Sequence, residues 1–316
     1  MSSSDVYKSK DWITEKAFIK KDDYKAMYKQ SISKPDEFWF EQGQRLDWFT
    51  PYTKVRDYSY EKDDLYIKWY EDGELNASYN CLDRHIEKNA DKIAVIWEGD
   101  DPSNSRKITY KELLTEVCKF SNGLKSLGVK KGDRVTIYMP MIPEAAYSML
   151  ACMRIGAIHS VVFGGFSPEA ISSRILDSDC QYVITADEGI RGGKRVNLKE
   201  NVDIALKNCP NVQKTIVFKY TNANIDWVDS RDICYEELIN QMPDVCKPEK
   251  MLAEDPSFIL YTSGSTGKPK GVMHTTGGYL LGATMSFKYI FGFSSEDVYW
   301  CTADVGWVTG HTYIVY

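Results

Sequence analysis

The sequence predicts an α/β protein with a doubly wound, mostly parallel sheet. From Leu75 onward, short apolar runs typical of buried strands alternate with segments whose apolar residues repeat at helical spacing. This alternation is typical of parallel sheets with helices on both faces. The composition agrees, because 43% hydrophobic and 27% charged residues among 316 provide a sizeable core and one or two domains.

The elements can be assigned in order along the chain. Residues 1–75 are rich in Lys, Asp, Tyr and Trp without a sustained period, and predict an irregular or helical N-terminal extension. A first α/β subdomain is expected over 76–250, and the start of a second over 251–316. The predicted strands are 93–97, 134–139, 160–163, 182–185, 215–218, 258–260 and 271–274. The predicted helices are one opened by a capping box at 109–112, then 144–155, 170–177 and 202–207.

Charge and cysteine content narrow the class of protein. A net charge of −6 without a long basic run argues against nucleic-acid and anionic-membrane partners and favours small-molecule substrates. The eight cysteines form no C-x-x-C pair, which is typical of reduced core thiols and of a cytoplasmic protein. The apolar stretch 145–166 contains Arg154 and several glycines, so a buried helix leading into a strand is expected there rather than a membrane span.

The run 261–271 combines three glycines, hydroxyl side chains and two lysines directly after an apolar strand. Such clusters are usually flexible surface turns. Here both lysines lie between glycines of the run, which favours phosphate binding. A Walker A loop is excluded, because Gly264 and Gly267 are too close together and Pro269 stands where Ser or Thr is required. An ordinary kinase or ATPase is therefore not expected.

The same run resembles the signature loop of the acyl-adenylate-forming enzymes. In that family the loop surrounds the phosphates of ATP while a carboxylate attacks the α-phosphate, with Mg²⁺ as the co-ion. The resemblance implies that ATP phosphates are bound by Thr262, Ser263, Gly264, Ser265, Thr266, Gly267 and Lys268, assisted by Lys270.

Further segments are similar to one branch of that family, the acetyl-CoA synthetases: 36–39, 80–85, 96–100, 162–167 and 300–311. By composition alone, the cluster around Trp300 predicts an aromatic core strand followed by a glycine turn. The resemblance instead implies an acyl pocket bordered by Val308 and Thr309. Discrimination of a two-carbon acid requires a small closed pocket. Trp307 and His311 receive no catalytic role.

A basic glycine-containing loop, 187–195, follows the predicted strand 182–185. In a bare sequence such a loop is as often a solvated turn. The resemblance implies that Arg191, Gly192, Gly193 and Lys194 hold the 3′-phosphoadenosine of CoA, together with Gly164 and Thr309. Lys194 stands where the family usually has arginine. The positive charge is kept, but lysine cannot donate the two parallel hydrogen bonds that a guanidinium gives to a phosphate.

The chain ends at residue 316 inside an apolar segment, so the sequence predicts the N-terminal part of a longer enzyme, inactive on its own. No catalytic residue or metal ligand is assigned within it. The implied reaction is AMP-forming acetate:CoA ligation, which uses ATP, CoA and Mg²⁺ and passes through acetyl-AMP. A propionyl-CoA or other short-chain synthetase, and a non-catalytic nucleotide-binding fragment, remain alternatives.

Overall fold

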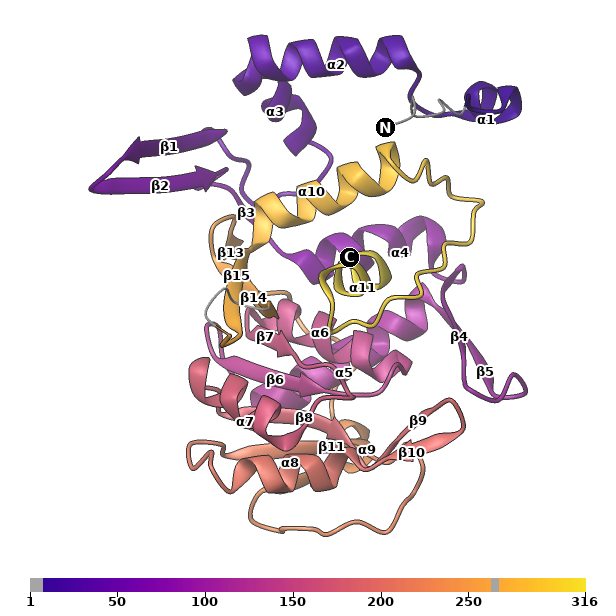
Figure 1. The fold of residues 1–316 in the computed structure, drawn as a ribbon, viewed down its shortest axis with the longest axis vertical. Coiled ribbons are helices and arrows are strands. Elements are labelled where there is room, and N and C mark those ends of the chain that lie inside the picture. The colour runs from indigo at the N-terminus through magenta and orange to yellow at the C-terminus, as the bar shows by residue number, and fades with distance from the viewer. Residues whose placement is uncertain (1–7, 263–266) are drawn as a thin grey trace, which may run out of the picture.

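The computed structural model describes residues 8–262 and 267–316. Within this part of the chain, the largest sheet has seven strands in the order β12-β11-β8-β6-β7-β14-β15 (Figure 1). All neighbouring pairs are parallel except β14 and β15. The strands are β6 (Arg134–Tyr138), β7 (Ile158–Val161), β8 (Tyr182–Ala186), β11 (Lys214–Phe218), β12 (Asp232–Cys234), β14 (Pro256–Thr262) and β15 (Lys270–Thr275). The predicted α/β fold class is confirmed.

Helices cover both faces of this sheet. The chain crosses from β6 to β7 in one direction and from β7 to β8 in the other, so right-handed crossovers put the intervening helices on opposite faces. Helices α5 (Tyr110–Ser126), α6 (Pro143–Ile155) and α9 (Tyr235–Asn240) pack together, as do α7 (Pro168–Asp177) and α8 (Leu198–Leu206). The sheet is therefore doubly wound, as predicted.

Local sequence signals explain where these elements begin and end. The predicted capping box opens α5: Thr109 Oγ1 accepts the Glu112 N–H at 3.2 Å, and the Glu112 carboxylate accepts the Thr109 N–H at 2.8 Å. Gly156, in the left-handed region, ends α6. Strand β7 begins two residues earlier than predicted and ends before Phe163, because the chain leaves the sheet to form the turn at Gly164.

The N-terminal part is more regular than predicted. It holds α1 (Asp11–Lys16), α2 (Lys21–Ser33), α3 (Pro35–Gly43) and an antiparallel hairpin of β1 (Arg56–Glu61) and β2 (Asp64–Trp69), which projects from the body (Figure 1). The hairpin was not predicted. It is followed by β3 (Glu74–Leu75), the π-helical turn η1 (Tyr79–Asp83), α4 (Arg84–Asn89), and a second hairpin of β4 (Ile93–Glu98) and β5 (Ser105–Thr109).

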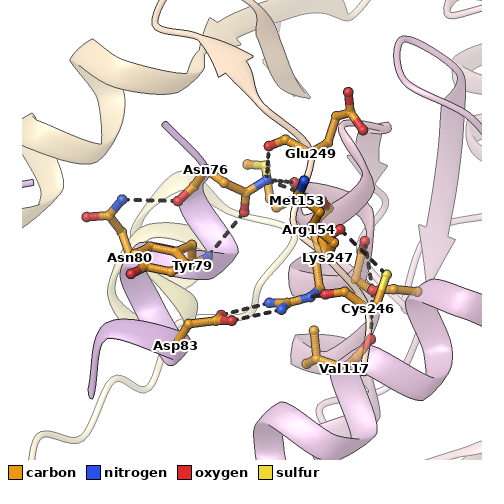
Figure 2. A network of polar contacts seen from close by, with 12 residues as sticks. Asn76, Tyr79, Asn80, Asp83, Val117, Met153, Arg154, Cys246, Lys247 and Glu249 are labelled. Carbon is orange, nitrogen blue, oxygen red and sulfur yellow. Dashed lines mark hydrogen bonds and ion pairs between the residues drawn. The ribbon is translucent and has the colours of Figure 1, made fainter. Parts of the chain in front are cut away.

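A buried polar network joins the N-terminal part to the sheet domain (Figure 2). The Arg154 guanidinium on α6 donates to both carboxylate oxygens of Asp83 at 2.7 and 2.8 Å, and its Nε donates to the Cys246 carbonyl at 2.6 Å. Asn76 Nδ2 donates to the carbonyls of Met153 and Glu249, both at 2.9 Å. Near it, β3 pairs with β13 (Met251–Leu252). The network fixes η1 against α6 and the connector before β13.

The last part of the chain contains α10 (Thr276–Tyr289), α11 (Val308–Gly310) and the π-helical turn η2 (His311–Val315). The interpretation of the segment around Trp300 as a core strand is wrong: no strand forms there, and Trp300 is 84% exposed. The eight cysteines are free, and six are buried. Among the described residues, no helix has the length and apolar character needed to cross a membrane.

Candidate functional site

Three of the predicted ligand-binding segments follow carboxyl ends of parallel strands. Gly164 follows β7, the basic loop follows β8, and the phosphate loop follows β14. These strands share one sheet and one direction, so their carboxyl ends lie along the same edge. Ligands of open α/β sheets bind at this edge, next to the point where the strand order reverses. Here the order reverses at β6, which has β7 on one side and β8 on the other.

The predicted phosphate loop connects antiparallel strands rather than a strand and a helix. Thr262 at the end of β14 pairs with Lys270 at the start of β15. Gly267 has φ +80°, which favours glycine. Lys268 and Lys270 are exposed, and neither makes an ion pair with another described residue. Ser263, Gly264, Ser265 and Thr266 lie outside the described residues.

The predicted CoA loop is a tight β-hairpin. Strands β9 (Gly189–Arg191) and β10 (Lys194–Val196) pair with Arg191 opposite Lys194, and Gly192 and Gly193 form the tip. Both glycines have positive φ, +57° and +72°, as a two-residue type I′ turn requires. The side chains of Arg191 and Lys194 are exposed, and no described carboxylate forms an ion pair with them. The turn therefore places two cations directly opposite one another.

A buried carboxylate that the sequence did not single out supports this hairpin. Asp187, 1% exposed at the end of β8, accepts the N–H groups of Tyr220, Thr221 and Ala223 at 2.9 to 3.1 Å. The next residue, Glu188, forms an ion pair with Arg195 on β10. The base of the hairpin is thus fixed to the loop after β11. An Asp-Glu pair at the end of an apolar strand was the only available sequence signal.

Phe163, also not predicted, connects three of the predicted segments. The Arg191 guanidinium lies over its ring at 4.9 Å from the centroid, and the Trp307 ring is 6.3 Å away. The adjoining Gly164 carbonyl accepts the Tyr138 hydroxyl at 3.0 Å. A Cβ at Gly164 would lie 3.0 Å from the Met139 carbonyl oxygen, so the close approach favours glycine. Arg191, Gly164 and the residues beside Trp307 therefore lie in one neighbourhood.

The predicted acyl-pocket residues are open to solvent. Val308 is 52% exposed and Thr309 is also exposed, both in the short helix α11. Just before them, Asp304 Oδ1 accepts the Gly306 N–H at 2.8 Å, and burial raises the pKa of the Asp304 carboxyl while nearby Arg191 opposes that shift. The described residues thus do not enclose the small closed pocket expected for a two-carbon acid.

His311 belongs to a buried aromatic cluster. Its Nε2 lies 2.9 Å from Nε2 of His159, and both rings are fully buried beside Phe258. Burial lowers the pKa of His159 to about 3 and that of His311 well below its ordinary value. A neutral pair packed in this way supports the core.

Comparison with known proteins agrees with this arrangement. A family model described as AMP-binding enzyme matches residues 82–316, which is well over half of the chain. The chain belongs to the AMP-binding enzyme family. A second model, described as acetyl-coenzyme A synthetase N-terminus, matches residues 24–81.

Several similar proteins are named acetyl-coenzyme A synthetase. An acetyl-coenzyme A synthetase of Aeromonas salmonicida (strain A449) is 60% identical over 317 residues, covering 100% of this chain and 49% of its own length. One of Vibrio vulnificus (strain CMCP6) is 57% identical, with the same coverage. The acetyl-coenzyme A synthetase 2 of Pseudomonas aeruginosa PAO1 is 58% identical over 98% of this chain and 48% of its own length. The chain spans about half the length of the curated relatives it matches.

The described side chains offer few donors for a metal ion. Among residues 8–262 and 267–316, no three His, Cys, Asp or Glu side chains cluster closely enough to hold a metal ion. Hard cations such as Mg²⁺ are usually bound by one or two carboxylates together with substrate phosphates. The described donors alone do not form a dedicated magnesium site.

Proposed function

We propose that this chain supplies the ATP-phosphate and CoA-binding half of an AMP-forming acetate:CoA ligase. The observation that carries the proposal is the 57 to 60% identity to acetyl-coenzyme A synthetases over the whole chain. That match includes both the phosphate loop and the β9–β10 hairpin, called the basic hairpin below. The reaction converts acetate, ATP and CoA into acetyl-CoA, AMP and pyrophosphate through acetyl-AMP.

The first half-reaction would use the loop after β14. Backbone N–H groups and hydroxyls of residues 262–267 hold the phosphates of ATP, while Lys268 and Lys270 neutralise their charge. Attack of the acetate carboxylate on the α-phosphate forms the acetyl-AMP bond and releases pyrophosphate. Because little covalent chemistry falls to the protein, positioning and electrostatic stabilisation are the main contributions. Among the described residues, both lysines are exposed and have no ion-pair partner, which supports this role.

The second half-reaction would use the β9–β10 hairpin. Arg191 and Lys194 attract the 3′-phosphate of CoA, while the Gly192-Gly193 tip and Gly164 allow close approach of the backbone. The CoA thiolate then attacks the acetyl carbonyl of acetyl-AMP, forming the thioester and releasing AMP. The contact of Arg191 with Phe163, which also packs against Trp307, supports a CoA path that leads from the hairpin toward the acyl segment. Val308 and Thr309 border the acyl group, and Thr309 also lies beside the CoA arm.

The remaining assignments are part of the same proposal. The chain divides into an extension over 1–75, a first α/β subdomain over 76–250 and the start of a second over 251–316, close to the boundary at 81 and 82 between the two matched family models. Its partners are the small-molecule substrates rather than nucleic acid or membrane, and its location is the cytoplasm. Mg²⁺, when bound with ATP, would neutralise phosphate charge.

The proposal is tested by acetate-dependent pyrophosphate release. The full-length product of the gene is assayed with ATP and with acetate, propionate or no acid. We expect release with acetate at a higher kcat/KM than with propionate. A preference for propionate would identify a different short-chain synthetase. Release independent of any carboxylic acid, or ADP as the product, would rule out the ligase.

A further inference from the structure

The tip of the basic hairpin is capped by a carboxylate from another part of the chain. The Gly193 N–H donates to Asp100 Oδ2 at 2.8 Å, across 93 residues of sequence. Asp100 lies in the turn between β4 and β5, and that turn otherwise has no role in the proposed function. A carboxylate on this N–H is notable, because the same tip is expected to face the terminal phosphate of CoA.

Asp100 is held in place by its own hairpin. The Gly99 N–H donates to the Asn104 carbonyl at 2.8 Å and closes the turn. On β4, the Trp97 indole N–H donates to the Met141 carbonyl at 2.7 Å, and the ring packs edge-on against Tyr220 at 6.4 Å. Tyr220 in turn donates its backbone N–H to Asp187, the carboxylate that supports the basic hairpin. The two hairpins therefore share one framework, and the contact at the tip has a fixed position.

The charged side chains at the tip of the hairpin do not form ion pairs with one another. Asp100 does not lie within ion-pair distance of Arg191 or Lys194, so its charge meets a backbone N–H while both cations remain unpaired among the described residues. A phosphate drawn between those cations would compete for the Gly193 N–H. It would also face the Asp100 charge at close range. The carboxylate thus occupies a position suited to an anionic ligand.

We propose that Asp100 acts as an internal substitute for the CoA 3′-phosphate and lowers the affinity of the hairpin for it. This inference rests on the proposed CoA-binding role of the hairpin. When CoA is absent, the carboxylate satisfies the tip N–H and holds the turn in shape. When CoA binds, the carboxylate is displaced or repelled, which weakens binding and favours release of the product thioester.

The test compares CoA with dephospho-CoA, which lacks the 3′-phosphate, by titration calorimetry on the full-length gene product. Asp100→Asn keeps an acceptor for the Gly193 N–H but removes the charge. Repulsion between a unit charge and a doubly charged phosphate at ~5 Å in water, reduced by salt, corresponds to about a three- to tenfold tighter Kd for CoA. The Kd for dephospho-CoA is expected to stay unchanged.

Asp101→Asn is the matched control, since Asp101 is the neighbouring carboxylate. Among the described residues, its side chain bonds only within its own turn, to Ser103 at 2.9 and 2.8 Å. It should change the Kd for CoA less than Asp100→Asn does. Asp100→Ala removes charge and acceptor together, and tighter CoA binding is expected there as well. If Asp100→Asn has no effect and Asp100→Ala weakens CoA binding, the carboxylate only anchors the turn and the inference is wrong.

The outcomes also separate this inference from the proposed function. A wild-type protein that binds CoA more tightly than dephospho-CoA, with Asp100→Asn unchanged, overturns the inference alone. A wild-type protein that does not distinguish the two ligands overturns the phosphate-binding role of the hairpin and the inference with it.

Discussion

Loss of the Asp83 carboxylate should destabilise the protein far more than loss of an equally short but exposed ion pair. The Arg154 side chain is 3% exposed and that of Asp83 is 21% exposed, and two hydrogen bonds of 2.7 and 2.8 Å join them (Figure 2). In Asp83→Asn the guanidinium stays buried, with one amide oxygen in place of a charged partner. Removing one partner of such a buried pair costs about 3 kcal/mol.

The matched control is Asp179→Asn. Asp179 pairs with Arg134 at 2.8 Å, but the two side chains are 59% and 30% exposed, so solvent screens the pair and the expected cost is below about 1 kcal/mol. Urea denaturation followed by circular dichroism measures both variants. With a slope of about 3 kcal/mol per molar urea, Asp83→Asn should move the midpoint by roughly 1 M. Equal midpoints for the two variants would refute the claim that the network in Figure 2 holds the N-terminal part to the sheet domain.

Three further predictions concern the core and the proposed site. Burial lowers the pKa of His159 to about 3 in the folded protein, whereas the histidine of the unfolded chain binds its proton near pH 6.5. The unfolded state therefore gains protons first as the pH falls. The free energy of unfolding should be unaffected above pH 6.5 and lower by about 2 kcal/mol at pH 5. The His159 ring signals in NMR should therefore not titrate between pH 7 and 5, and a midpoint near 6.5 would contradict the burial argument. Arg191→Ala should weaken CoA binding about tenfold and leave dephospho-CoA binding unchanged, as measured by calorimetry; an equal loss for both ligands would place the phosphate elsewhere. Lys268→Ala should lower acetate-dependent pyrophosphate release about a hundredfold in a steady-state assay, whereas a wild-type rate would remove Lys268 from the phosphate site.

The sheet domain was predictable because its local signals agree with its packing. The strands β6, β8 and β11 are short apolar runs buried on both faces, and the capping box at Thr109 is a purely local feature, so each was visible in the sequence. The hairpin β1–β2 was not visible: Tyr60 and Leu65 are largely exposed, and their strands have no buried face to impose a period. The composition of the segment around Trp300 does not indicate its exposure either, since its aromatic residues are those of a core strand.

The candidate site was predicted only where glycines and cations stand together in the chain. The sequence singled out Gly192, Gly193 and their flanking cations as candidates, and the structure brings Arg191 and Gly164 together around Phe163. Asp187 and Asp100 were missed as supports, because their partners lie about 35 and 93 residues away and no spacing rule connects them. Such contacts follow from how strands are ordered in the sheet, which a local pattern does not encode.

The central claim, that the phosphate loop and the basic hairpin serve an AMP-forming ligase, is tested most directly by the nucleotide product. The full-length gene product is incubated with ATP, acetate and CoA, and the nucleotides and thioester are separated by chromatography. We predict AMP and acetyl-CoA in equal amounts, with neither formed when acetate is omitted. Formation of ADP, or of AMP without acetate, would contradict the claim.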